Sequence, residues 1–156
     1  MLKVYLAARY GRRTEMLDYA MQLKAKGHQV VSKWIDGHHE LASEHGAQAD
    51  IAADDRERAG WALEDLCDLQ AANCAIVFTH VPNGIGRERG GYNVELGWVI
   101  GYNDGARGWG APWGIRLIVV GPRVNVFHSL DLLDRQPALT EHYDNWTECL
   151  TALEAG

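Results

Sequence analysis

Residues 74–79 read CAIVFT, a continuous apolar run that predicts a strand buried on both faces of a sheet. Similar runs occupy 2–8 (LKVYLAA) and 117–120, the latter within RLIVVG, and 28–34 with its Val-Val pair predicts a further strand. Strands that are apolar along their whole length and alternate with helices are typical of a parallel sheet covered on both faces. The sequence therefore predicts a three-layer α/β domain.

The segments between these runs have helical spacing or the composition of loops. Residues 12–26 place Met16, Ala20 and Leu23 on one helical face, and Gly27 follows as a helix stop. Further helices are predicted over 48–72 (broken near Gly60), 91–103 and 145–154, with loops over 36–46, 80–90 and 105–114. No repeat or linker divides the chain, so residues 1–156 are predicted to form one domain.

Composition and charge exclude several classes of protein. The chain has 156 residues, of which 47% are apolar and 23% charged, as in ordinary globular domains. Its apolar runs fall short of the roughly 18 residues that a membrane span needs, so no membrane contact is expected. The net charge is −6 without a broad basic stripe, which argues against a nucleic-acid polymer as partner. The three cysteines are an odd number without paired spacing and predict reduced thiols in a cytoplasmic protein.

The charges are unevenly spread along the chain. Residues 1–33 hold seven Lys or Arg against two acids, whereas residues 36–68 hold ten acids against two Arg. The cluster Arg9, Arg12 and Arg13 has two interpretations, a site for one phosphate or a solvated helix start.

The helix predicted over 48–72 carries an acid where apolar residues are expected. Asp65 lies within an apolar stripe at helical spacing, while Glu64 and Asp68 are predicted to point elsewhere; the stripe is Trp61, Ala62, Leu66, Leu69 and Ala72. A carboxylate on a core-facing stripe is costly unless it is paired or hydrogen-bonded. Asp65 either bonds a loop backbone for structural reasons or serves a functional site.

The helix predicted over 91–103 is apolar nearly all round, which predicts that it is buried, and Glu95 is its only charge. We expect Glu95 in the first helical turn, where the helix dipole keeps a carboxylate ionised and nucleophilic. The alternative interpretation is that the negative charge of Glu95 only complements the partial positive charge of the helix N-terminus. Two carboxylates near strand ends, Asp65 and Glu95, suggest glycosyl chemistry, in which one attacks an anomeric carbon and the other orients the sugar.

The glycines gather around this helix, and ten of the 17 fall between Gly84 and Gly114. Gly97 and Gly101 lie four apart, which predicts close packing of the helix against neighbours. The segment GIGRERG at 84–90 fails the spacing of a dinucleotide fingerprint. The His and Glu residues of 38–45 form a polar loop and not a known zinc motif.

Five stretches in order resemble the nucleoside 2-deoxyribosyltransferase superfamily, which includes the 2′-deoxynucleoside 5′-monophosphate N-glycosidases. They are VYLAARYGRRTEM, SKWIDG, EDLCDLQAANCAIVFT, GGYNVELG and VVGPRVNVFH, within about residues 2–130. The resemblance implies a flavodoxin-like or Rossmann-like α/β fold with a central parallel sheet of about five strands. It also implies a homodimer or higher homo-oligomer, no metal, no cofactor, and a deoxynucleoside or deoxynucleotide with a free base as ligands.

The resemblance also implies residue roles. Glu95 matches the nucleophilic glutamate of the V-E-L-G motif, Asp65 the aspartate that holds the deoxyribose hydroxyl, and Tyr5 the tyrosine that orients the nucleophile. Asn125 resembles the asparagine that members lend to the neighbouring subunit's sugar site. The remaining candidates for substrate contact are Ala8, Arg9, Trp34, Arg89 and Gly91.

One position departs from the transferase pattern. Transferases carry an aspartate six residues before the nucleophile to handle the base's proton, and Arg89 stands there in this chain. A basic, glycine-rich loop with Arg87, Arg89 and Gly90 is suited to a 5′-phosphate, which keeps a nucleotide hydrolase as an alternative to base exchange. A non-catalytic nucleotide-binding module is a third hypothesis. Trp34 is predicted to stack on a base and to form a lid with 80–91.

Overall fold

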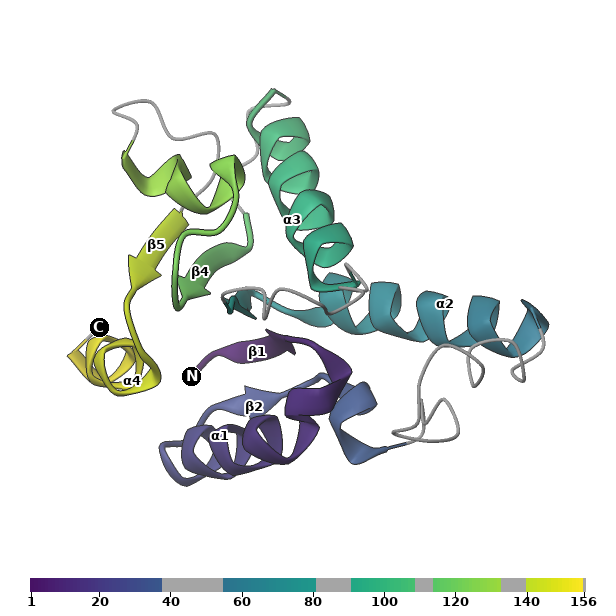
Figure 1. Ribbon diagram of the computed structural model, residues 1–156, viewed down its shortest axis with the longest axis horizontal. Helices are drawn as coiled ribbons and strands as arrows, with labels where there is room; N and C mark the ends of the chain where they lie inside the picture. Colours follow the sequence, from purple (N-terminus) through teal and green to yellow (C-terminus); the bar gives the residue numbers. More distant parts are fainter. Residues whose placement is uncertain (38–54, 81–90, 109–113, 133–139, 156) are drawn as a thin grey trace.

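The computed structural model describes residues 1–37, 55–80, 91–108, 114–132 and 140–155. Its centre is a five-stranded, wholly parallel sheet with the strand order β2-β1-β3-β4-β5 (Figure 1). The strands are β1 (Lys3–Ala7), β2 (Gln29–Val30), β3 (Cys74–Phe78), β4 (Arg116–Val120) and β5 (Thr140–Tyr143). The parallel sheet predicted from the apolar runs is confirmed.

Helices cover both faces of this sheet. The α-helices are α1 (Arg13–Ala25), α2 (Asp55–Ala71), α3 (Gly91–Gly108) and α4 (Trp146–Ala155). An aromatic cluster joins α1 and α4 over one face, because Tyr19 stacks on Trp146 at 4.4 Å between ring centroids and Phe78 of β3 lies 5.8 Å from Trp146. Helices α2 and α3 contact each other and β1 on the other side (Figure 1). The three-layer α/β fold is therefore confirmed.

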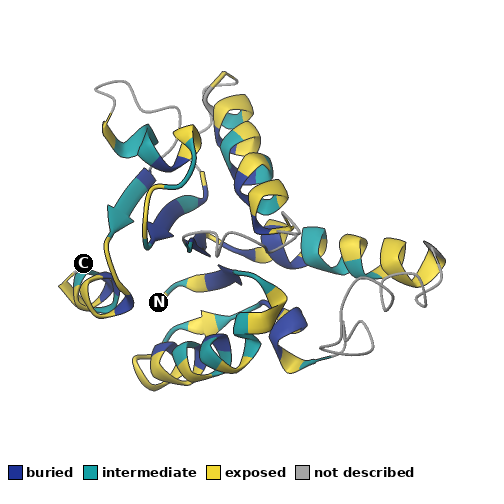
Figure 2. Ribbon diagram, in the orientation of Figure 1, coloured by how far each residue is buried: buried dark blue, intermediate teal, exposed yellow. Residues whose placement is uncertain are grey.

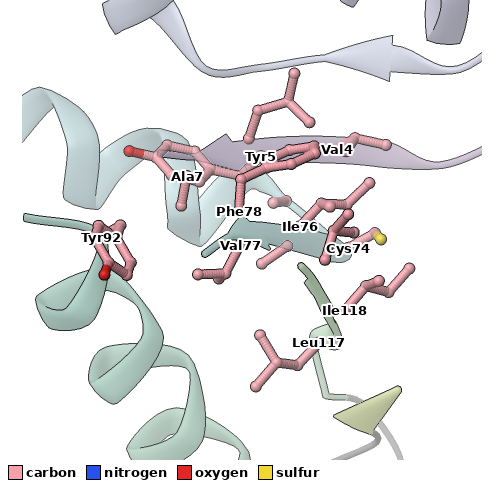
Figure 3. Close-up of a cluster of buried hydrophobic side chains, with 14 of the residues drawn as sticks. Val4, Tyr5, Ala7, Cys74, Ile76, Val77, Phe78, Tyr92, Leu117 and Ile118 are labelled. Atoms are coloured by element: carbon pink, nitrogen blue, oxygen red, sulfur yellow. The ribbon is translucent and has the colours of Figure 1, made fainter. Parts of the chain in front are cut away.

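The core follows the apolar runs of the sequence. All five residues of β3, and the last four of both β1 and β4, are buried (Figure 2). Figure 3 shows side chains of these strands packed together, with Tyr92 at the start of α3 beside them. Helix α1 buries Met16, Ala20 and Leu23, the three residues predicted from helical spacing. Burial of such side chains is the main favourable term in forming this sheet.

Three element boundaries differ from the sequence-based prediction. The second strand is confined to Gln29–Val30, and Lys33–Asp36 forms the 3-10 helix η2. Helix α2 runs through Gly60 without the predicted break. Helix α3 continues to Gly108, so the first part of the loop predicted over 105–114 is helical. Gly60, Gly105 and Gly108 are exposed, and single glycines are tolerated within a helix at a modest cost in stability.

Strand β5 was not among the strands predicted by position, because its sequence TEHY is short and polar, without apolar alternation. Its pairing with β4 is supported by a side-chain interaction instead. The Arg116 guanidinium donates to both carboxylate oxygens of Glu141, at 2.6 and 2.7 Å. Before it, Val126–Leu132 forms the 3-10 helix η4.

The carboxyl ends of β3 and β4 are held together by Thr79 and Gly121. The Thr79 backbone N–H donates to Val120 O at 2.9 Å, and the Thr79 hydroxyl donates to Pro122 O at 2.7 Å. Gly121 has φ +109°, and a β-carbon there would lie 2.8 Å from Thr79 Oγ1. Only glycine allows this close approach without strain. None of the described helices is long and apolar enough to cross a membrane.

Candidate active site

The order of the strands reverses between β1 and β3, and ligands of open parallel sheets bind beyond the carboxyl ends of the strands at such a point. Tyr5, on β1, pairs in register with Ala75 of β3, at this junction of the sheet. Tyr5 is fully buried, and its hydroxyl donates a hydrogen bond to Glu95 Oε1 of α3 at 2.5 Å. The central β1 strand and α3 are therefore joined by a short, charge-assisted hydrogen bond.

Asp65 of α2 reaches the same place. The pKa of the Tyr5 phenol is raised, chiefly by burial, then by the charges of Glu95 and Asp65 and by hydrogen bonding to both carboxylates. Tyr5 therefore stays protonated and acts as a hydrogen-bond donor. The three residues that the sequence singled out as catalytic come from β1, α2 and α3, and the structure brings them together.

The pKa of Glu95 is raised from 4.5 to about 7. Burial of the carboxyl is the largest cause, the Tyr5 hydrogen bond lowers the pKa, and the negative charge of Asp65 raises it. The Glu95 carboxyl therefore holds its proton to a higher pH than an ordinary glutamate does. A raised pKa produced by burial and a like charge is typical of functional carboxyls.

The prediction that the helix dipole keeps Glu95 ionised is wrong. Helix α3 begins at Gly91, so Glu95 is its fifth residue, and the first turn contains no acid. The dipole effect falls off within the first turn. Burial beside Asp65 therefore governs the titration of Glu95, in the direction opposite to the one predicted.

The prediction that α3 is buried all round is also wrong within a single chain. Leu96 and Val99 are buried against the sheet, but Val94 is 71% exposed and Tyr102 is 42% exposed. A β-carbon at Gly97 or Gly101 would have no atom within 4 Å, so neither glycine serves close packing within the chain. One face of α3 thus combines exposed apolar side chains with open glycines.

The three arginines after β1 have separate contacts. The Arg12 guanidinium pairs with Glu15 at 2.7 Å and donates to Thr79 O, while Arg13 donates to Ile35 O at 2.9 Å. Arg9 Nη1 donates to His80 Nε2 at 3.2 Å, which joins the chain just beyond β1 to the chain just beyond β3. Arg12 and Arg13 thus have structural roles, whereas Arg9 lies at the edge where ligands of this fold bind.

Trp34 was predicted to form part of a lid and to stack on a base, but it lies in the packed core. Its side chain is 5% exposed, and its indole N–H donates to Leu6 O at 2.8 Å. Tyr10 lies beside it, with 6.1 Å between ring centroids. A side chain fixed in this way belongs to the packed core, where little of the ring is left to cover a ligand.

The other predicted substrate contacts are partly described. Ala8 is half-buried directly after β1, and Gly91 is the exposed first residue of α3. Arg89 and the rest of 81–90 lie outside the described residues. Asn125 follows β4, and its Nδ2 donates to Asn93 Oδ1 of α3 at 3.2 Å, so within its own chain it contacts a residue two positions before Glu95. Its contact with a neighbouring subunit's sugar stays a prediction.

Sequence reasoning missed two polar residues near this region. Asp68 was predicted to point away from the core, yet it is buried, accepts the Lys33 backbone N–H at 2.9 Å and pairs with Lys33 Nζ at 3.0 Å. His80 was predicted only as part of a loop. Its position directly after a buried strand was the available signal, because such positions lie at the carboxyl edge of a parallel sheet.

Comparisons with solved structures find the same fold in two enzymes. The 2-deoxyribosyltransferase from the psychrotolerant bacterium Bacillus psychrosaccharolyticus matches with a TM-score of 0.55 and 17% identity, over 95% of this chain and 90% of that one. The CMP N-glycosidase of Clostridium botulinum matches with a TM-score of 0.51 and 16% identity, over 99% of both chains. No protein-family model and no curated protein matches the sequence. The chain thus shares the fold of enzymes from the superfamily that its motifs resemble.

The raised pKa of Glu95 predicts a pH-dependent cost in stability. The folded state holds the Glu95 proton up to about pH 7, whereas the unfolded chain releases it near pH 4.5, so the free energy of unfolding falls as pH rises between these values. Glu95→Gln does not titrate and escapes this loss. Denaturant unfolding across this range should show the variant gaining stability relative to the wild type as pH rises. If the difference in unfolding free energy between Glu95→Gln and the wild type does not change with pH, the raised pKa of Glu95 is contradicted.

Proposed function

We propose that this protein cleaves the N-glycosidic bond of 2′-deoxynucleosides through a covalent deoxyribosyl intermediate on Glu95 and passes the sugar to another base. The observation that carries the proposal is the Tyr5–Glu95 hydrogen bond of 2.5 Å beside Asp65. The fold shared with a 2-deoxyribosyltransferase and an N-glycosidase supports the same class of reaction.

In the proposed reaction each of the three residues has a distinct role, which their arrangement supports. Tyr5 holds Oε1 of Glu95, which leaves Oε2 to attack the anomeric carbon. As the new C–O bond forms, the bond from the anomeric carbon to the base breaks, and its electron pair leaves with the base, which takes up a proton. Asp65 accepts a hydrogen bond from a deoxyribose hydroxyl and fixes the sugar for in-line attack.

The second half-reaction restores the enzyme. A nitrogen of an incoming base attacks the anomeric carbon and gives up its proton, and the ester bond to Glu95 breaks with its electron pair returning to the carboxylate. Water in place of the base gives hydrolysis, so the partition depends on how well the bound base excludes water. Nucleophile attack requires the ionised carboxylate, and a pKa of about 7 makes the rate sensitive to pH in the neutral range.

One observation favours a nucleoside 5′-monophosphate N-glycosidase as a second candidate. Within the described residues, the Arg9 guanidinium contacts the His80 imidazole, whereas Arg12 is neutralised by Glu15. A cationic group beside an imidazole at the carboxyl ends of β1 and β3 is suited to bind a phosphate monoester. In this candidate the same Glu95 chemistry ends with water.

A substrate panel separates these candidates. Deoxynucleosides and their 5′-monophosphates are incubated with the protein, with and without a second base, and products are resolved by chromatography. A transferase gives the exchanged nucleoside, a hydrolase gives the free sugar or its 5-phosphate, and the binding-module hypothesis predicts no turnover. Glu95→Gln should reduce turnover at least about 1,000-fold, because it removes the nucleophile.

The matched control is Asp104→Asn, which neutralises an exposed acid on the same helix and should leave turnover unchanged. Wild-type turnover by the Glu95→Gln variant would contradict the assignment of Glu95 as the nucleophile. Absence of turnover across the panel in the wild type would contradict the enzymatic proposal itself.

We also propose that the open face of α3 is a contact between subunits, as the family resemblance implies a homo-oligomer. Val94, Trp98 and Tyr102 lie four residues apart, and Trp98 stacks on Tyr102 at 5.2 Å between ring centroids. Gly97 and Gly101 lie between them with open space above their α-carbons, which allows a second helix to approach closely. Such a charge-poor helical face is typical of interfaces between identical subunits.

The double variant Val94→Lys, Tyr102→Lys should remain folded and become monomeric, because both side chains are exposed in the single chain. Sedimentation velocity at micromolar concentration should show a dimer or larger species for the wild type. Met21→Lys, at a 60% exposed position on α1, is the control and should keep the wild-type state. A monomeric wild-type protein, or an unchanged double variant, would contradict this interface.

A further inference from the structure

A buried histidine lies beyond β4, outside the catalytic cluster. His128 of η4 is 0% exposed, and a buried polar side chain needs hydrogen-bond partners. The Val124 backbone N–H donates to its Nδ1 at 3.2 Å. Burial, His142 and Arg123 lower the pKa of His128. The ring is therefore neutral and carries one ring hydrogen: Nδ1 accepts from Val124 in one tautomer, and Nε2 accepts from Asn125 in the other.

The Nε2 atom of His128 faces the carboxamide of Asn125, with 3.0 Å between Nε2 and Nδ2. With the ring hydrogen on Nδ1, Nε2 is an acceptor and takes one N–H of the Asn125 amide. Asn125 is held from two further sides, because its Oδ1 accepts the Phe127 backbone N–H at 2.9 Å and its Nδ2 donates to Asn93 at 3.2 Å. The two N–H groups of Nδ2 thus point to His128 and Asn93 while Oδ1 accepts, so one orientation of the carboxamide makes all three contacts.

The contact between Asn125 and Asn93 matters because of the place of Asn93 in α3. It is the third residue of α3, two residues before Glu95, at the end of the helix nearest the catalytic cluster. A continuous path of side-chain contacts therefore runs from a fully buried residue beyond β4, through Asn125, to the start of the helix that carries the nucleophile. The main support of Glu95 from β1 is Tyr5, so this path provides a second fixed point from a different strand.

We propose that His128 and Asn93 are positioning residues for Glu95: with Asn125 between them, they fix the start of α3 against the loop after β4. This inference rests on the proposed function of Glu95. Fixing both the helix start and the carboxylate oxygen determines the direction from which Oε2 meets the sugar. A displacement of about 1 Å in such a group costs about 100-fold in rate.

Two substitutions of His128 separate positioning from bulk stability. In His128→Gln the side-chain amide reaches the place of Nε2 and keeps the contact with Asn125. In His128→Asn the shorter amide takes the place of Nδ1, keeps the Val124 N–H bond and loses the contact with Asn125. Both replace a buried ring by a smaller amide, so both lower the melting temperature.

The proposal predicts that His128→Asn loses about 10-fold to 100-fold in kcat with little change in KM, whereas His128→Gln retains most of kcat. Asn93→Ala removes the other end of the path at an exposed position, so the protein stays folded, and it should lose kcat as His128→Asn does. Equal losses of kcat in the two His128 variants, or wild-type kcat in Asn93→Ala, would overturn the proposal.

Amide hydrogen exchange gives a readout that does not depend on turnover. The backbone N–H groups of Glu95, Leu96 and Gly97 report opening of the start of α3, because they bond to the carbonyls one turn earlier. Their exchange should be faster in His128→Asn and Asn93→Ala and unchanged in His128→Gln. Unchanged exchange in all three variants would overturn the positioning role even if the wild type cleaves no substrate, an outcome that would separately overturn the proposed function.

Discussion

The hydrogen bond from Tyr5 to Glu95 connects the centre of the sheet to the helix that carries the candidate nucleophile. Tyr5 is fully buried in a strand paired on both sides, so its position is fixed by the backbone ladders of β1 with β2 and β3. The carboxylate that it meets is partly buried and lies near Asp65, and both conditions make its ionised form costly. The sheet thus provides the rigid element that holds a carboxylate of raised pKa.

Much of this arrangement is predictable from sequence because each part depends on a local pattern. The apolar runs of β1, β3 and β4 indicate their own burial, and parallel strands bring Tyr5 and the segments after them to one edge. Asp65 was identifiable because a carboxylate within an apolar stripe is costly unless it has a partner. The role given to Tyr5 came from the family resemblance. For Glu95 the residue pattern left two interpretations open, a nucleophile or a charge at the helix terminus, and the resemblance favoured the nucleophile.

Features that depend on contacts far apart in sequence were not predictable in the same way. Strand β5 is polar, and its pairing depends on Arg116 and Glu141, 25 residues apart. The pKa of Glu95 follows from burial beside Asp65, 30 positions away, and not from its place along the helix. Contacts between α3 and the loop after β4 are a further example, made by Asn93, Asn125 and His128. No periodicity in the sequence predicts them.

The central claim is that Glu95 attacks the sugar, and the direct test is to trap the product of that attack. The protein is mixed with a 2′-deoxynucleoside or its 5′-monophosphate, quenched in acid during turnover, digested, and its peptides are mapped by mass spectrometry. The account predicts a deoxyribosyl adduct, or its 5-phosphate, on the Glu95 carboxylate. Turnover that proceeds with the adduct on another residue would contradict it.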